Sequence, residues 1–176
     1  MKPQITDLDT WNKAEQLLQP SFIRLLDNFR KALEGSHWQS HYEDIATWPE
    51  DTTPVQKEQY EQLIVKLDQA KPDEVSEIES LLSQIPEPEM AYELQLCRDE
   101  KTLRFDMWQL CYQVCFCNYV PGFDLPGVDL PGAPRETGAT QVVAIDSALL
   151  DAEGEVDWVA LDHKVKAIVE RIVNHL

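Results

Sequence analysis

Two histidines and a nearby acid are the first residues whose types and spacing could support chemistry. His37 and His41 lie at i, i+4, and Glu43 follows closely. On a helix, this spacing places both imidazoles on one face, as in zinc-binding helices. However, the metalloprotease motif is not matched, and Gly35-Ser36 indicates a helix end or a loop. We favour two surface histidines, with a metal-binding protein or small enzyme using His37, His41 and Glu43 as the alternative.

Four cysteines in the middle of the chain are the next candidates. They follow the pattern C-x3-C-x-C at Cys111, Cys115 and Cys117, with Cys97 upstream. Structural zinc sites usually show C-x2-C or C-x4-C pairs, and a disulfide framework would spread its cysteines along the chain. A nucleophilic cysteine would need a neighbouring histidine, and the sequence does not place His163 beside this cluster. We therefore interpret the cysteines as buried free thiols, typical of a reducing compartment.

Recognisable catalytic and cofactor motifs are absent from the sequence. It contains no phosphate-binding glycine loop, no G-x-S-x-G and no H-E-x-x-H. We therefore predict no cofactor and do not favour an enzyme. A small-molecule pocket near Trp108, Tyr112 and Phe116 is a further alternative, although aromatic residues in an apolar stretch are more typical of a core.

A repeated Pro-Gly segment is the most unusual feature of the chain. Residues 120–134 repeat an apolar-Pro-Gly pattern three times, as Val120-Pro-Gly, Leu125-Pro-Gly and Leu130-Pro-Gly. Proline followed by glycine is the signature of a type II turn, so three successive turns are predicted. This loop either covers one end of the core or docks on a partner protein.

The elements that must position these residues centre on residues 91–119. Residues 92–96 and 103–107 alternate polar and apolar side chains, which predicts a β-hairpin. With Glu100 and Lys101 at the centre of the turn, Leu96 would face Phe105 and Leu94 would face Met107. For residues 108–119 we favour a second, buried strand after a bend, because aromatic and β-branched residues are dense there. A helix is the alternative, since several apolar residues also fit helical spacing.

Helical patterns flank this centre on both sides. A short first helix, capped by Thr6 or Asp9, is predicted to break at Pro20, where a second helix begins and runs to Gly35. Residues 36–53 are predicted to be a loop. Thr53 is predicted to cap a third helix, and a fourth follows the break at Lys71-Pro72. Residues 140–145 are predicted to add a strand to the central sheet, and Asp157 to cap a final helix.

We therefore predict a single α+β domain over residues 1–176. A mainly helical half, residues 1–88, packs on a small, mainly antiparallel sheet within residues 89–176. The C-terminal helix covers that sheet.

The charge of the chain limits the kinds of partner it can bind. The 176 residues include 32 Asp and Glu against 15 Lys and Arg, a formal charge of −17. Such a surface repels nucleic-acid phosphates, so nucleic-acid binding is disfavoured. No apolar run approaches the roughly 20 residues of a membrane span, and the N-terminus lacks the apolar core of a signal peptide. We expect a cytoplasmic protein, and we assign no oligomeric state.

The function predicted from these patterns is a non-catalytic acidic protein-interaction module, such as an assembly factor, regulator or inhibitor. It would dock on a basic or apolar patch of another protein through its acidic helical surface and the 120–134 loop. The loop residues expected to contact the partner are Phe123, Asp124, Leu125, Val128, Asp129 and Leu130.

Overall fold

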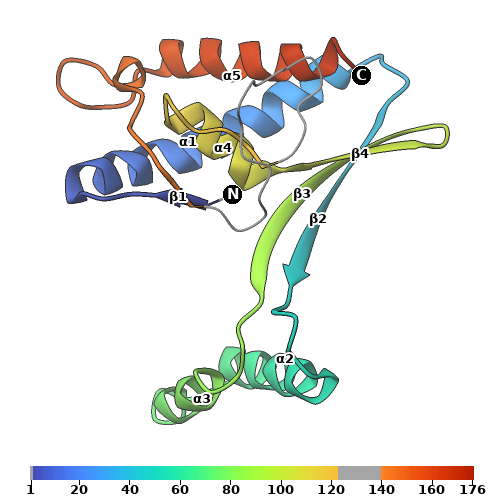
Figure 1. Ribbon diagram of the computed structural model, residues 1–176, viewed down its shortest axis with the longest axis vertical. Coiled ribbons are helices and arrows are strands. Elements are labelled where there is room, and N and C mark those ends of the chain that lie inside the picture. The colour runs from blue at the N-terminus through green and yellow to red at the C-terminus, as the bar shows by residue number, and fades with distance from the viewer. Residues whose placement is uncertain (1, 123–139) are drawn as a thin grey trace. The chain divides into compact units, whose positions relative to one another are not determined.

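The computed structural model of the protein describes residues 2–122 and 140–176. This part of the chain has a mixed α+β fold (Figure 1), which confirms the predicted fold class. The helices are α1 (Leu8–Leu33), α2 (Pro54–Asp68), α3 (Val75–Leu82), α4 (Met107–Cys115), the short 3-10 helix η1 (Ser147–Leu149) and α5 (Trp158–Val173). The strands are β1 (Lys2–Gln4), β2 (Gln39–Thr47), β3 (Glu89–Arg98), β4 (Lys101–Asp106) and β5 (Thr140–Val142).

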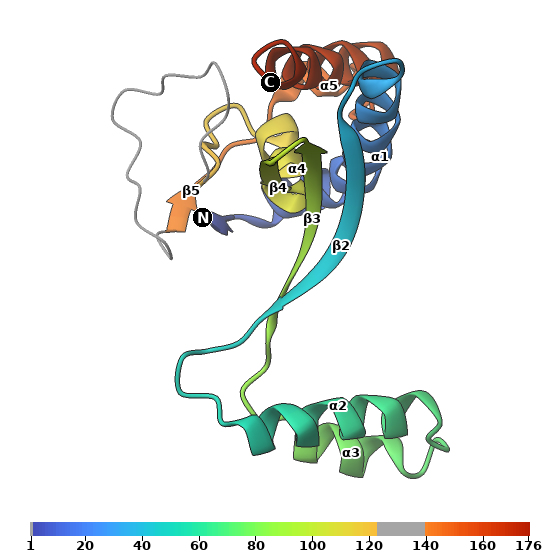
Figure 2. The same cartoon turned by 90° about the vertical axis from the view of Figure 1, so that its right-hand side faces the viewer.

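Two compact units make up the chain. Unit 1 comprises residues 1–43 and 92–176, and unit 2 comprises residues 44–91. Every buried residue of the hydrophobic core belongs to unit 1. Unit 2 contains the helices α2 and α3, which lie side by side in Figures 1 and 2.

The first helix, α1, is continuous, so the predicted break at Pro20 is wrong. Asp7 caps its N-terminus by accepting a hydrogen bond from the backbone N of Thr10 (2.8 Å), in place of the predicted Thr6 or Asp9. A buried stripe at helical spacing continues through the proline: Ala14, Leu17, Ser21, Leu25, Phe29 and Leu33. Packing of this stripe in the core keeps the chain helical, although Pro20 has no N–H to donate.

The central hairpin is confirmed, but its register differs from the predicted one. β3 and β4 are antiparallel, with Leu94 opposite Phe105 and Leu96 opposite Leu103. The turn therefore has only two central residues, Asp99 and Glu100. Asp99 has a φ of 53°, the only positive φ among the non-glycine residues of the described chain. A positive φ at the first central position is typical of a type II′ turn, whose usual residue there is glycine. Without a glycine in this segment, the sequence does not indicate so tight a turn.

The strand favoured for residues 108–119 is wrong, because the helix α4 occupies Met107–Cys115. Asp106 ends β4 and caps α4, since its carboxylate accepts hydrogen bonds from the backbone N of Trp108 (2.9 Å) and of Gln109 (3.3 Å). The buried residues of α4 share one helical face: Met107, Leu110, Cys111, Val114 and Cys115. A good cap and this apolar face outweigh the strand preference of the individual residues.

The remaining strands differ from prediction in two ways. β2 lies within the segment predicted to be a loop, and it joins β3 and β4 in the order β2-β3-β4 (Figure 2). Most of its side chains are exposed, so the sequence shows no apolar alternation there. The strand predicted at residues 140–145 is present only as β5, and it pairs in parallel with β1 instead of joining the central sheet.

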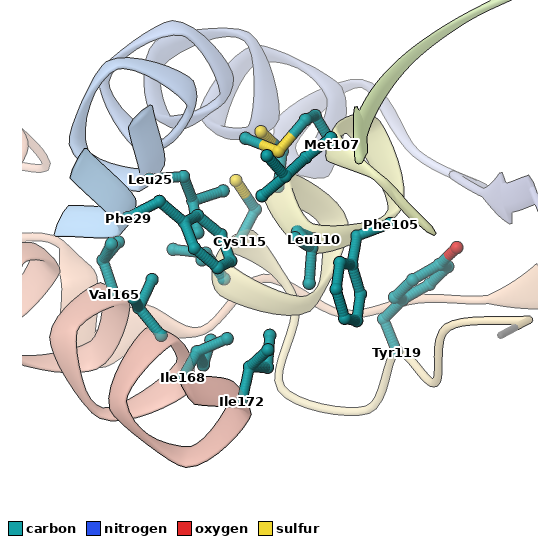
Figure 3. Close-up of a cluster of buried hydrophobic side chains, with 14 of the residues drawn as sticks. Leu25, Phe29, Phe105, Met107, Leu110, Cys115, Tyr119, Val165, Ile168 and Ile172 are labelled. Atoms are coloured by element: carbon teal, nitrogen blue, oxygen red, sulfur yellow. The ribbon is translucent and has the colours of Figure 1, made fainter. Parts of the chain in front are cut away.

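The core of unit 1 lies where α1, α4 and α5 meet the β3–β4 hairpin (Figure 3). The predicted inner face of the hairpin is fully buried: Leu94, Leu96, Phe105 and Met107. Asp157 caps α5 as predicted, accepting hydrogen bonds from the backbone N of Val159 and of Ala160 (both 3.0 Å). α5 lies against α1 and also contacts α4. Figure 3 shows Ile168 and Ile172 of α5 directed toward Leu110 and Phe105.

The two helices of unit 2 form as the sequence predicts. Thr53 and Gln56 make a reciprocal capping box at the start of α2, with Pro54 as its first residue. α3 follows the break at residues 71–72. None of the helices in the described part of the chain combines the length and the apolarity that a bilayer crossing requires.

Candidate functional site

The predicted partner-contacting residues of the Pro-Gly loop lie outside the described residues. These are Phe123, Asp124, Leu125, Val128, Asp129 and Leu130. The structure does describe the chain on both sides of them, up to Gly122 and from Thr140 onward.

Two amide side chains join residues 118–120 to residues 141–144, the described segments on either side of the undescribed residues. Asn118 donates through Nδ2 to the carbonyl of Val142 (3.0 Å) and accepts through Oδ1 from the backbone N of Ala144 (2.9 Å). In return, Gln141 donates to the carbonyl of Asn118 and accepts from the backbone N of Val120 (3.1 Å). Each amide therefore satisfies one donor and one acceptor of the opposite segment, much as strand pairing would.

A third amide attaches the loop to α4. Oε1 of Gln109 accepts a hydrogen bond from the backbone N of Gly122 (2.7 Å), and Nε2 of Gln109 donates to Asp106 (3.1 Å). Pro121, which precedes Gly122, is buried. The start of the loop, at Val120 and Gly122, is therefore held by hydrogen bonds to Gln141 and Gln109. The roles of Gln109, Asn118 and Gln141 were not predicted, and their one signal in the sequence is that polar amides occur on either side of the repeat.

The histidines considered for a metal site lie apart from any helix. His37 lies between α1 and β2, while His41 and Glu43 lie within β2, and all three side chains are exposed. The helical i, i+4 spacing on which the metal-site alternative depended is therefore not present. Glu43 instead accepts a hydrogen bond from Gln95 (3.1 Å). In residues 2–122 and 140–176, no three His, Cys, Asp or Glu side chains gather as a metal site would require.

The aromatic residues considered for a small-molecule pocket pack on other aromatic rings of unit 1. The ring of Trp108 stacks on Phe22 at a centroid distance of 5.2 Å. Tyr112 contacts Phe116 (6.3 Å) and Tyr119 (5.5 Å), and Phe116 is buried. The three side chains therefore pack as part of the core, with Trp108 at its exposed edge.

All four cysteines are free thiols, in two different environments. Cys111 and Cys115 are buried on α4, as predicted, whereas Cys97 is half-buried and Cys117 is exposed. Burial raises the pKa of Cys115 to about 11, although a hydrogen bond with Ser21 (3.5 Å) opposes the change. Burial also raises the pKa of Cys111. The thiolate form that nucleophilic chemistry needs is therefore disfavoured at both buried positions.

The α2–α3 hairpin of unit 2 has an unusually exposed apolar surface. No residue of either helix is fully buried. The half-buried apolar residues at helical spacing are Tyr60, Leu63 and Leu67 in α2, and Val75, Ile78 and Leu82 in α3. Four further apolar side chains are between 41% and 63% exposed: Val55, Ile64, Val65 and Leu81. Two helices alone bury too little surface to cover these side chains.

Unit 2 is also the more acidic part of the chain for its length. Its 48 residues include twelve Asp and Glu but only three lysines, a net charge of −9 out of the total of −17. The lysines are Lys57, Lys66 and Lys71. The α2–α3 hairpin itself, residues 54–82, has seven acids and the three lysines, a net charge of −4, and the other five acids lie in the segments before and after it. Exposed apolar side chains thus lie on a helical hairpin with a net negative charge.

Comparison with protein-family models, with curated proteins and with solved structures finds no match, so the function of this chain has to be inferred from its own residues.

Proposed function

We propose that this protein is a non-catalytic interaction module that docks on another protein, as an assembly factor, regulator or inhibitor does. The docking surfaces are the acidic α2–α3 hairpin and the 120–134 loop. The observation that carries the proposal is the hairpin, in which neither helix has a fully buried residue although apolar side chains lie on both.

Charge and apolar surface have separate effects in such a complex. The negative charge of unit 2 attracts a basic partner over a distance and speeds their encounter. The apolar side chains of α2 and α3 then stabilise the complex once water is excluded from them. The same charge disfavours nucleic acids, whose phosphates it repels.

The ends of the 120–134 loop support its part in the proposal. Gln109, Asn118 and Gln141 make side-chain hydrogen bonds that hold the start of the loop, up to Gly122, and the segment from Gln141 to Ala144 that follows it. Fixed ends reduce the conformational entropy that a loop loses on binding. We place the interaction in the cytoplasm, because all four cysteines are free thiols and reduced thiols persist there.

The test is affinity purification of the tagged full-length chain from its native organism, at low and at high salt, with mass spectrometry. We expect a defined partner in stoichiometric amount, and less of it at high salt, because exposed charges are screened. A variant with residues 121–132 replaced by a short linker should keep its circular dichroism spectrum but lose this partner. Finding no stoichiometric partner in either salt condition would contradict the proposal.

A further inference from the structure

A groove runs between α2 and α3 within unit 2, with a volume of about 420 Å³. Three of its lining residues are apolar, and we call them its floor: Leu63 of α2, Leu81 of α3 and Ile85, which follows α3. Leu81 is 45% exposed, and Leu63 and Ile85 are half-buried.

Neutral amide side chains accompany the apolar floor. Gln62 donates to Glu58 (3.3 Å), and Gln84 donates to the carbonyl of Ser80 (3.1 Å). Both glutamines line the groove, and each still has an Oε1 acceptor for a bound chain. An apolar floor with polar edges is suited to an amphipathic segment.

The length of the groove indicates which secondary structure would fit. Along α2 the lining extends from Gln56 to Lys66, which corresponds to about 15 Å of helix. This is roughly three turns, the contact length of a helix that lays its i, i+3, i+4, i+7 stripe into a groove between two helices. A third helix would also bury the apolar side chains that α2 and α3 leave exposed.

Charge distinguishes between the possible occupants of the groove. A second copy of this chain would bring a further −9 against the −9 of unit 2 and would be repelled. Acids adjoin the groove on both helices, since Glu58 is one turn from Gln62 and Glu77 is one turn from Leu81. Lys66 is a single opposing charge at one end. A helix with Lys and Arg flanking its apolar stripe matches this surface.

We propose that the α2–α3 groove binds a basic amphipathic helix of a partner protein. The apolar stripe of that helix contacts Leu63, Leu81 and Ile85, and its basic side chains lie beside the acids of α2 and α3. This inference rests on the proposed function and specifies the element of the partner that is recognised.

The test uses the full-length chain and two labelled synthetic peptides of about 18 residues, or five helical turns. One peptide carries a leucine stripe flanked by Lys and Arg. The other has the same composition, but its leucines are moved off the stripe. We expect the first to bind with 1:1 stoichiometry by fluorescence anisotropy, at least about tenfold more tightly than the second. It should also shift the NMR signals of the side-chain amides of Gln62 and Gln84.

A matched pair of variants separates groove binding from general attraction to an acidic surface. Leu81→Ser removes an exposed apolar side chain from the groove floor, and Val65→Ser removes one that is 58% exposed and outside the groove. We expect Leu81→Ser to weaken peptide binding about tenfold and Val65→Ser to change it less than about twofold. Circular dichroism monitors the helicity of both variants.

Two double variants test the same groove if Leu81→Ser unfolds the α2–α3 hairpin. Gln59→Arg with Gln62→Arg adds two positive charges in the groove, and Ser76→Arg with Ser80→Arg adds two on α3 outside it. Only the first pair should abolish the preference for the striped peptide. Equal binding of both peptides, or equal effects within each pair of variants, would overturn the inference.

The proposed function can fail separately from this inference. A native partner whose binding survives Leu81→Ser and the double Gln→Arg variant would overturn the groove assignment while leaving the interaction module standing. If the striped peptide binds the groove but no native partner exists, the proposed function fails instead.

Discussion

At the residue scale, Lys164 joins three segments of unit 1. From α5, its ammonium group donates to the carbonyl of Val114 in α4 (2.6 Å) and to the carboxylate of Asp146 (2.7 Å). Burial alone would raise the pKa of Asp146, but the hydrogen bond and the charge of Lys164 outweigh burial, so the pKa lies below its usual value. The stabilisation from this carboxylate is therefore complete above about pH 4 and is lost as the pH falls through the lowered pKa.

We expect Lys164→Met to lower the free energy of unfolding by about 1–2 kcal/mol at pH 7, because it leaves the half-buried carboxylate of Asp146 without its charged partner. The difference in the free energy of unfolding between the wild type and Lys164→Met should become smaller as Asp146 is protonated below about pH 4. Urea unfolding of both proteins between pH 3 and pH 7 measures this. The control is Lys166→Met, whose pair with Glu170 is exposed and 3.8 Å apart; it should cost less than about 1 kcal/mol. Equal costs for the two variants would contradict the role of Lys164.

At the element scale, Pro20 lies inside a helix that the core maintains. Pro20 removes one backbone hydrogen bond from α1, yet the helix is continuous from Leu8 to Leu33. We expect Pro20→Ala to raise the free energy of unfolding by about 1–2 kcal/mol, since the restored hydrogen bond outweighs the stiffness that proline gives the unfolded chain. Thermal or urea unfolding tests this, with the exposed Gln19→Ala as control and an expected change below about 0.5 kcal/mol. Loss of stability in Pro20→Ala would show that the proline ring itself contributes to packing.

The elements also show where sequence patterns are reliable and where they are not. The capping box at Thr53 and the N-cap at Asp157 were predictable, because their hydrogen bonds join residues within one helical turn. α4 was not, because residues 107–115 fit both a buried strand and a helix. The cap at Asp106 and the packing of the apolar face against α1 and α5 together favour the helix. β2 was missed for a related reason: its strand pairing with β3 involves backbone atoms, and its side chains are mostly exposed.

At the scale of the whole molecule, the sequence of unit 2 is an insertion between the parts of β2 and β3 that belong to unit 1. The chain leaves unit 1 after Glu43 and returns at Tyr92, where the rings of Tyr42 and Tyr92 stack at 5.8 Å. All buried residues of the core lie in unit 1. Replacing residues 44–91 by Asn-Gly should therefore leave unit 1 folded, because this dipeptide can close a tight turn between adjacent strands.

The measurement is thermal unfolding of the shortened protein, monitored by near-ultraviolet circular dichroism. We expect a cooperative transition and the aromatic signal of packed Phe22, Trp108 and Tyr112. A non-cooperative transition with a retained far-ultraviolet signal would show that unit 1 needs unit 2 to pack. Because the shortened protein lacks α2 and α3, we also expect that it does not bind the basic helical peptide.

The sequence by itself determined the fold class, the helices of unit 2, the central hairpin and the acidic surface. These follow from hydrophobic periodicity, local caps and composition, each of which acts over a few residues or over the chain as a whole. The tertiary structure alone decided that α1 continues through Pro20, that α4 is a helix and that β5 pairs with β1. It also brought Asn118 and Gln141 together and formed the groove between α2 and α3. These features depend on contacts between residues distant in sequence, whose free energy outweighs the local preference of each segment.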